Sequence, residues 1–160
     1  MKRTLAWRHP RQRGAATIEY VFLVAFGLVP LLLLTFTGVM IFAAKQSLTL
    51  AAEEGARAAM RQPAIVGGQN AMAVRQANAC AVASVNMKWL LNFSSPAVTR
   101  CNTRLLEGGD CGLAGARCIS VETTYNYDMA PFFPGTGALY RWTLGEPIRS
   151  TAVAQLDTDV

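Results

Sequence analysis

The feature that most constrains this chain of 160 residues is an uncharged, almost wholly apolar run from Val21 to Ala44. Between Arg13 and Lys45 the only charged residue is Glu19. As a helix, the run would be roughly 36 Å long at about 1.5 Å per residue, which is enough to cross a hydrocarbon core of about 30 Å with some tilt. It therefore predicts a transmembrane helix, with the membrane span at about residues 20–44.

The charges that flank this run are unevenly distributed. The formal net charge is +5. The segment before Gly14 contains no acidic residue and five basic ones: Lys2, Arg3, Arg8, Arg11 and Arg13. The rest of the chain has as many acidic as basic residues, so its composition does not indicate the basic surface of a nucleic-acid-binding protein. Because Lys45 alone follows the run, with Glu53 and Glu54 soon after, we predict a cytoplasmic N-terminus and an exported region after about residue 45.

A secretory signal peptide is the alternative interpretation of the same run. Two observations disfavour it. The run is longer than the apolar part of a signal peptide, and no small-x-small cleavage site follows it, since Ile41 and Phe42 precede Ala43 and Ala44. We therefore expect the apolar helix to remain in the protein as an anchor.

Helical spacing continues beyond the apolar run. Every fourth residue contributes to a polar stripe: Lys45, Thr49, Glu53, Arg57 and Arg61. Another side holds small and apolar residues that would let other helices approach closely: Leu48, Ala52, Ala56, Ala59 and Met60. We expect one transmembrane and stem helix over residues 15–62, ended by Pro63 and Gly67-Gly68, with Pro30 kinking it or loosening a turn.

The segment before the span reads Arg11-Gln12-Arg13-Gly14-Ala15-Ala16-Thr17-Ile18-Glu19-Tyr20. It resembles the class III leader of type IV prepilins, and its Glu-Tyr pair resembles the Flp or Tad subgroup. The resemblance implies that a prepilin peptidase removes the basic leader, residues 1–14, by cutting between Gly14 and Ala15 on the cytoplasmic side. Glu19 and Tyr20 would then be the fifth and sixth residues of the mature chain.

Glu19 also attracts attention on physical grounds. A carboxylate at the head of a membrane helix is costly unless it has a partner, so it indicates a functional site. Cleavage would create an ammonium group on Ala15, and this group in a neighbouring subunit could pair with Glu19 and set the axial register of a helix bundle. The alternative is that Glu19 lies at the level of the lipid headgroups, where water solvates it.

The resemblance extends to the stretch from Gly14 to Met60, which includes Pro30–Leu34 and the Ala-Ala-Glu-Glu-Gly-Ala-Arg run of Ala51–Arg57. This stretch is similar to the N-terminal region of TadE-like minor pilins, and the Tyr-Asn-Tyr and Pro-Phe-Phe-Pro elements within residues 125–134 are more weakly similar to the C-terminal part of that family. The resemblance implies a structural minor pilin or pseudopilin that takes part in Flp pilus assembly, adhesion and biofilm formation. The implied partners are the prepilin peptidase, other pilins and minor pilins, and the bacterial inner membrane.

The part of the exported region that follows the stem, residues 63–160, is predicted to be an α+β domain in the periplasm. Asn70–Leu91 is predicted as a second helix that packs through one side: Val74, Ala77, Ala81, Val85 and Trp89. Cys118–Tyr127 alternates as a half-buried strand, with Ile119, Val121, Tyr125 and Tyr127 on one face. Tyr140–Leu144 and Ile148–Ala154 are further candidate strands, joined by a Gly145-Glu146-Pro147 turn. The predicted fold is thus α+β and pilin-like, with a long N-terminal helix, a second helix and a small C-terminal antiparallel sheet.

Four cysteines lie in the exported region: Cys80, Cys101, Cys111 and Cys118. An even number of cysteines in an oxidising compartment predicts two disulfides, for which three pairings are possible. The segment from Cys101 to Cys118 is rich in Gly, Arg and Asn and is interpreted as a loop in need of a covalent link. We favour Cys80 with Cys101 and Cys111 with Cys118, without excluding the other pairings.

The segment from Met129 to Gly137 contains Pro131-Phe132-Phe133-Pro134 and has too much proline and glycine for a strand. It is interpreted as an apolar loop with three possible roles: a contact between subunits, a patch near the membrane, or a cover folded back over the domain's own core.

Residue types argue against an enzyme. The only histidine is His9 in the leader, no Cys-x-x-Cys pair exists, and no paired carboxylates or phosphate-binding loop follow Gly14. We therefore expect no catalytic residue, metal or cofactor. The alternative to a pilin is an uncleaved single-pass envelope protein whose outer domain binds a partner.

Overall fold

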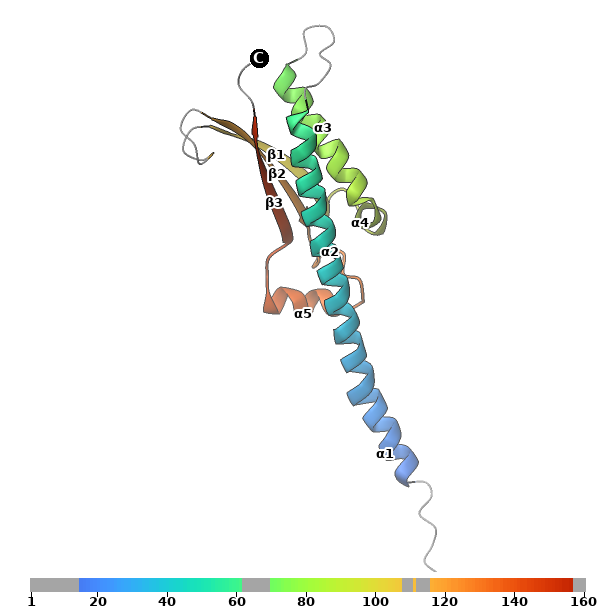
Figure 1. The fold of residues 1–160 in the computed structure, drawn as a ribbon. Helices are drawn as coiled ribbons and strands as arrows, with labels where there is room; N and C mark the ends of the chain where they lie inside the picture. Colours follow the sequence, from blue (N-terminus) through green and yellow to red (C-terminus); the bar gives the residue numbers. More distant parts are fainter. Residues whose placement is uncertain (1–14, 62–69, 108–110, 112–115, 157–160) are drawn as a thin grey trace, which may run out of the picture. The chain divides into compact units, whose positions relative to one another are not determined.

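The computed structural model describes residues 15–61, 70–107, 111 and 116–156 (Figure 1). The chain divides into two compact units, one ending at Gly38 and one beginning at Val39, and each is described by itself. The fold is α+β, as the sequence predicts: an apolar N-terminal helix, further helices and a three-stranded antiparallel sheet.

The first unit consists of α1 (Ala15–Leu23), a π-helical turn η1 (Val24–Leu28) and the beginning of α2 (Val29–Met60). The turn closes with the N–H of Val29 donating to the carbonyl of Val24. Pro30 follows directly; it has no N–H to donate, and its ring crowds the carbonyl four residues earlier, which a wider turn relieves. This π-turn is in keeping with the loosened turn expected at Pro30.

The stem helix ends close to its predicted end. α2 ends at Met60, whereas the sequence indicated Gln62. Gln62, Pro63 and Gly67-Gly68 lie outside the described residues, as does the basic leader.

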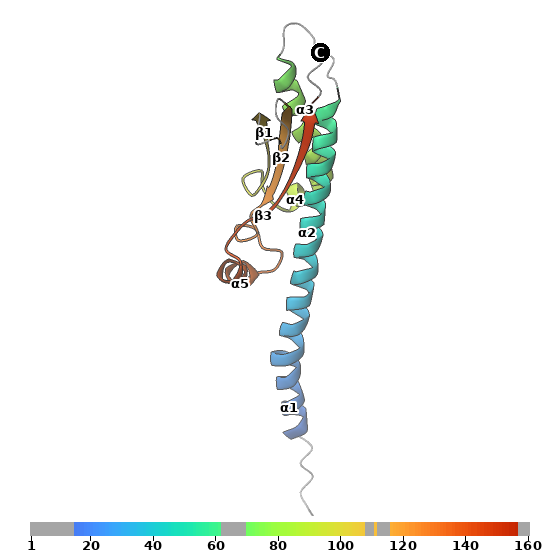
Figure 2. The same cartoon turned by 60° about the vertical axis from the view of Figure 1, so that its left-hand side comes forward.

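In the second unit, the part of α2 from Val39 onward packs with α3 (Ala71–Asn86) against one face of the sheet (Figures 1 and 2). A short α4 (Lys88–Phe93) follows α3. The sheet has the order β1-β2-β3, with β1 (Thr99–Glu107), β2 (Arg117–Tyr125) and β3 (Ile148–Leu156). Its inner face and the two helices bury one of two core clusters: Ala56, Ala59, Ala79, Ile119, Val121, Ala154 and Leu156.

The second helix is divided, contrary to the prediction. Instead of one helix over Asn70–Leu91, there are two, because Met87 leaves the helical conformation with φ −104° and ψ 18°. Asn70 is the N-cap, and its side chain accepts a hydrogen bond of 3.0 Å from the N–H of Met72.

The predicted packing face of that helix is wrong. Val85 is 70% exposed, Ala77 and Ala81 are exposed, and the buried residues are instead Ala79, Ala83, Met87 and Leu90. Alanine occurs all round this helix, so the apolar period is ambiguous, and close approach to the small residues of α2 selects the alanine face.

Two strand predictions also need correction. Tyr140–Leu144 is not a strand: it lies in and just after α5 (Thr136–Thr143), and Gly145, with φ 67°, accepts the left-handed conformation that often ends a helix. The supposed loop between Cys101 and Cys118 contains most of β1, which pairs with β2 over its full length, from Thr99 opposite Tyr125 to Glu107 opposite Arg117.

The strand predicted at Cys118–Tyr127 is confirmed as β2. Ile119, Val121, Tyr125 and Tyr127 are fully buried, although Tyr127 lies just beyond the strand. Ile148–Ala154 is confirmed as β3, which continues to Leu156.

Candidate assembly site

The sequence-predicted processing and assembly residues lie at the start of the apolar helix. Gly14 is outside the described residues, and Ala15 begins α1. Glu19 and Tyr20 lie one turn further along α1, and both side chains are exposed. Within the described part of the chain, Glu19 forms no ion pair. The carboxylate at the head of the helix is therefore accessible to a cation from outside the subunit.

The surface of the first unit is apolar and exposed. Thirteen large apolar or aromatic side chains from Ile18 to Phe36 are each 45% exposed or more: Ile18, Tyr20, Val21, Phe22, Leu23, Phe26, Leu28, Val29, Leu31, Leu32, Leu33, Leu34 and Phe36. At about 1 kcal/mol for each half-exposed side chain, covering them is worth on the order of 10 kcal/mol. This equals the whole stability of a typical domain, so the helix requires lipid or other helices around it.

Two threonine hydroxyls along this helix are satisfied within it. The hydroxyl of Thr35 donates to the carbonyl of Leu31, and that of Thr37 donates to the carbonyl of Leu33 at 2.6 Å. Such bonds to the preceding turn let a threonine lie in hydrocarbon without an unpaired donor. Among the described residues, one helix, Ala16–Met60, is long and apolar enough to cross a membrane by length and composition.

Two glycines on this helix leave room beside the backbone. A Cβ placed on Gly27 or Gly38 would meet no atom within 4 Å. Gly55, in the second unit, is the opposite case. There a Cβ would lie 2.9 Å from the carbonyl oxygen of Ala79 and 3.1 Å from Cγ1 of Val121. α2, α3 and β2 therefore meet at Gly55 at a distance that only glycine permits.

The alanine side of α2 is the packed side. Of the predicted small-residue side, Leu48, Ala52, Ala56 and Ala59 are buried, whereas Met60 is half exposed and was wrongly included. Met60 is the last residue of the helix, where the packing against α3 ends.

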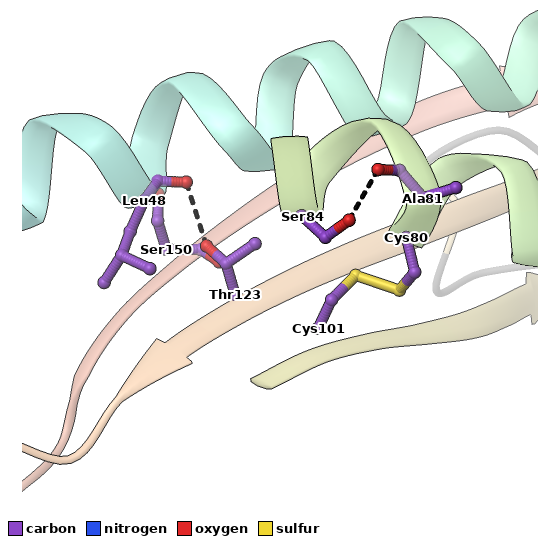
Figure 3. Close-up of a disulfide and its surroundings, with 7 residues drawn as sticks. All are labelled: Leu48, Cys80, Ala81, Ser84, Cys101, Thr123 and Ser150. Atoms are coloured by element: carbon purple, nitrogen blue, oxygen red, sulfur yellow. Dashed lines mark hydrogen bonds between the residues drawn. A yellow bond between two sulfur atoms is a disulfide. The ribbon is translucent and has the colours of Figure 1, made fainter. Parts of the chain in front are cut away.

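Polar bonds join α2 to the sheet beside this packing. The buried hydroxyl of Thr123 donates to the carbonyl of Leu48 at 2.9 Å (Figure 3). Ser150 on β3 is hydrogen-bonded to Thr49 through the two hydroxyls at 3.2 Å, and Lys45 donates to the carbonyl of Arg149. The first residues of the polar stripe thus face β3.

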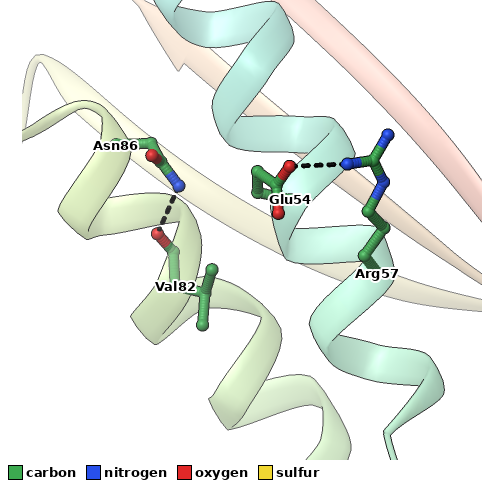
Figure 4. A network of polar contacts seen from close by, with 4 residues as sticks. All are labelled: Glu54, Arg57, Val82 and Asn86. Atoms are coloured by element: carbon green, nitrogen blue, oxygen red, sulfur yellow. Dashed lines mark hydrogen bonds and ion pairs between the residues drawn. The ribbon is translucent and has the colours of Figure 1, made fainter.

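The rest of that stripe faces solvent. Arg57 pairs with Glu54 at 2.7 Å across one turn, while Asn86 on α3 donates to the carbonyl of Val82 at 3.2 Å (Figure 4). An exposed pair of this kind contributes about 0–1 kcal/mol, so it does little to hold the helices together.

Two disulfides link the elements of the second unit. Cys80 on α3 is joined to Cys101 on β1 (Figure 3), and Cys111 is joined to Cys118 on β2. This is the pairing favoured on the sequence. The first disulfide fixes α3 to the edge strand β1.

The proline-rich loop folds back over the domain's own core. The ring of Phe132 packs with those of Trp89, Phe93, Tyr125 and Tyr127, with centroid distances of 5.0 to 5.9 Å. Of the three roles considered for this loop, the structure therefore shows the cover over the core.

Three tyrosine hydroxyls hold the segment after β2 in place. Tyr125 donates to the carbonyl of Ala130, Tyr127 is bonded to Thr136 at 2.7 Å, and Tyr140 donates to the carbonyl of Glu146 at 2.9 Å. Burial, helped by the nearby Tyr127, raises the pKa of Tyr125 to about 12. Burial also raises the pKa of Tyr140, with smaller contributions from Glu146 and Tyr127.

An open depression of about 380 Å³ lies beside the first disulfide and is lined by Cys80, Ser84, Met87, Leu91, Pro96, Thr99, Arg100, Cys101 and Asn102. Among the described residues, no group of three or more His, Cys, Asp or Glu side chains is placed to hold a metal ion.

Comparison of the chain with protein-family models, with curated proteins and with solved structures finds no match.

Proposed function

We propose that this chain is a structural subunit of the TadE-like minor pilin type, which a prepilin peptidase processes after Gly14 and which takes part in Flp pilus assembly, adhesion and biofilm formation. In this proposal the apolar helix first anchors the chain in the bacterial inner membrane, with the second unit in the periplasm. The same helix later packs against other pilins and minor pilins. The function is assembly, without a chemical step.

The observation that carries the proposal is an exposed apolar helix with an exposed carboxylate at its head. Covering the side chains from Ile18 to Phe36 is worth on the order of 10 kcal/mol, and either a bilayer or a bundle of similar helices would supply the cover. Glu19 is the only charged residue between Arg13 and Lys45, so it gives this otherwise apolar surface one position that distinguishes one register from another.

Processing would provide the partner for Glu19. Cutting after Gly14 removes five basic residues and leaves an ammonium group on Ala15, which begins α1. When two helices pack side by side with an axial offset, the ammonium group of one subunit meets Glu19 of its neighbour. Pairing the two charges outside water favours that offset over others, because any other offset leaves the carboxylate desolvated and alone.

The periplasmic location is supported by the disulfides. Both link cysteines in the second unit, and structural disulfides are retained in oxidising compartments such as the periplasm. The uneven flanking charges favour the same orientation.

Processing is tested by N-terminal sequencing of the protein from cells that contain the peptidase. We expect the mature chain to start at Ala15, and we expect Gly14→Leu to retain the leader. Gly38→Ala is the matched control, since Gly38 has open space around it and lies away from the cut. An intact Met1, or a start at another residue, would overturn the processing claim and favour an uncleaved envelope anchor.

The role of Glu19 is tested separately, in a chain that is already cleaved. Glu19→Gln keeps the size of the side chain and removes its charge. We expect normal membrane insertion, normal cleavage and loss of the chain from sheared pilus fractions. Incorporation at the unaltered level would contradict the pairing of Glu19 with a neighbouring amine.

A further inference from the structure

The short helix α5 exposes an apolar face whose neighbours in the fold indicate what covers it. Trp142 is 83% exposed, Leu144 is 64% exposed and Leu139 is 45% exposed. Leu139 and Trp142 are three residues apart, so they lie on the same side of the helix, and Leu144 follows at its C-cap. A nearly fully exposed tryptophan between two exposed leucines is unusual for a surface that meets only water.

The opposite side of α5 is firmly held by the second unit. Gly137 and Tyr140 are the buried residues of the helix. A Cβ on Gly137 would lie 3.1 Å from the carbonyl oxygen of Asp128, so helix and loop are in close contact there. Arg141 pairs with Asp128 at 3.4 Å. These contacts fix the rotation of α5, and they fix Trp142 on its outer side.

The position of α5 within the second unit places it beside the end of the apolar run. Tyr140 belongs to the same buried cluster as Ala44, and Ile41 packs against that cluster. Ile41 and Ala44 are in the last turns of the uncharged run, which ends where Lys45 begins the polar stripe. Tyr140, two residues before Trp142, thus belongs to the same buried cluster as the residue at which the predicted span ends.

We propose that α5 rests on the surface of the phospholipid bilayer, with Leu139, Trp142 and Leu144 inserted among the headgroups and the first carbons of the acyl chains. This inference rests on the proposed anchoring of the chain by its apolar helix. Tryptophan favours the boundary between hydrocarbon and water, because its ring is apolar and its N–H seeks a hydrogen bond.

A bilayer suits this face better than a free protein partner does. Stable protein interfaces bury about 800 Å² on each partner, whereas this face consists of three large side chains on a helix of 8 residues. Such a small face binds weakly on its own. A bilayer crossed by the same chain is already present at a high effective concentration, so a weak contact is sufficient.

The contact gives the second unit a defined orientation on the membrane. The second unit would then be attached to the membrane at two points: the transmembrane helix, which leaves the bilayer near Ala44, and the inserted face of α5. Two points of attachment restrict tilting of the domain. Before assembly, the domain would therefore present the same side to neighbouring subunits in the plane of the membrane.

Tryptophan fluorescence of the full chain in phosphatidylcholine vesicles tests the proposal. The chain contains Trp7, Trp89 and Trp142. In the variant W7F/W89F the emission comes from Trp142 alone. Vesicles whose acyl chains carry bromine close to the headgroups quench tryptophans at that depth.

The matched control is W7F/W89F/W142F/V153W. Val153 lies on β3, is 54% exposed, and is five residues from Ile148, the residue of β3 that belongs to the Ala44 cluster. At about 3.3 Å per residue the control tryptophan lies roughly 16 Å further along the strand. We expect Trp142 to emit at shorter wavelength and to be quenched at least about twofold more strongly than the control tryptophan.

A chain that floats with the vesicles while Trp142 is quenched no more than the control would overturn the proposal and leave the anchor intact. A chain that does not float would overturn both. Emission at short wavelength without quenching by bromine would also overturn it, since Trp142 would then be covered by protein and not by lipid. In the W7F variant, which keeps Trp89, Trp142→Phe should remove the quenched part of the emission, and this comparison guards against a folding defect in the W89F background.

Discussion

The first unit and the packed part of α2 use opposite kinds of residue on helical surfaces. From Ile18 to Phe36 the side chains are large, apolar and exposed, whereas from Ala44 to Ala59 the buried residues are mainly alanine. Large side chains offer much apolar area to whatever surrounds a helix, while small ones let two backbones approach each other. Side-chain size thus separates the helical surface that is buried in the folded domain from the helical surface left exposed for lipid or other helices.

The disulfide between α3 and β1 should have the largest effect on the folded unit. Cys80 and Cys101 are 21 residues apart in sequence, and a link that closes such a loop stabilises by about 3 kcal/mol. We expect C80S/C101S to lower the free energy of unfolding by this amount, as measured by denaturant titration of the full chain in detergent. Membrane insertion should remain normal, because the first unit contains no part of this link.

The second disulfide provides the comparison. Cys111 and Cys118 are 7 residues apart, so C111S/C118S should cost only about 2 kcal/mol. An equal loss in both variants would contradict the dependence on loop length. A failure of C80S/C101S to insert would contradict the independence of the two units.

Gly55 and Gly38 offer a direct contrast between a packed and an open helical surface. Alanine at Gly55 gains about 1 kcal/mol of helix propensity, but it forces apart the contact with Ala79 and Val121, at a cost of about 2–3 kcal/mol. We expect a net loss of about 1–2 kcal/mol, measured by the same titration.

Gly38→Ala is the matched substitution in the open surface, and it should not lower the stability of the folded unit. If Gly55→Ala were as stable as the unaltered chain, α2, α3 and β2 would not be packed as closely as described.

Tyr125 should produce a smaller, pH-dependent effect. Its pKa is raised from 10.0 to about 12, so the unfolded chain loses the phenolic proton at lower pH than the folded chain does. The stabilisation that this raised pKa gives the folded state is complete below pH 10 and is lost as the pH rises from 10 towards 12. Tyr125→Phe should cost about 1 kcal/mol at neutral pH, through the lost bond to Ala130, and should weaken the fall in stability above pH 10.

Tyr20→Phe is the control for this substitution, because Tyr20 is 67% exposed in the first unit. It should leave the stability of the second unit unchanged at every pH. Identical alkaline titrations for Tyr125→Phe and the unaltered chain would contradict the assigned burial of Tyr125.

The sequence predicts the fold well where one physical signal dominates. The uncharged run indicates the apolar helix, and strict alternation through Ile119 and Val121 indicates β2. Where the signal is weak, prediction fails. β1 begins Thr99-Arg100-Cys101 with little apolar character, because its edge position leaves much of it in water. From Cys101 onward its sequence therefore predicts a loop, which is wrong.

The wrong prediction of a strand where α5 lies has a different cause. Tyr140–Leu144 is a short run with aromatic residues, which cannot be distinguished from a strand by periodicity alone. A glycine at Gly145 with a proline at Pro147 is a helix-ending signal that could have corrected the interpretation. The exposed face of α5 could not be predicted, since it depends on Tyr140 reaching the Ala44 cluster through the tertiary fold.

The candidate assembly residues were found from local sequence alone. Glu19 was identified because a charge within an apolar run is conspicuous, and its exposure on α1 agrees with a contact made outside the subunit. In the proposed assembly the partner of Glu19 belongs to a second chain, so the fold of one chain does not predict it.

The most direct test of the account compares crosslinks from its two surfaces in living cells. A photoreactive phenylalanine analogue is placed at Phe26, which is 75% exposed on the apolar helix, or at Val85, which is 70% exposed on α3. We expect irradiation to join Phe26 to the apolar helices of other pilus subunits, with much lower yield at Val85. Equal yields at the two positions, or subunit crosslinks from Val85 alone, would contradict the claim that the apolar helix is the assembly surface.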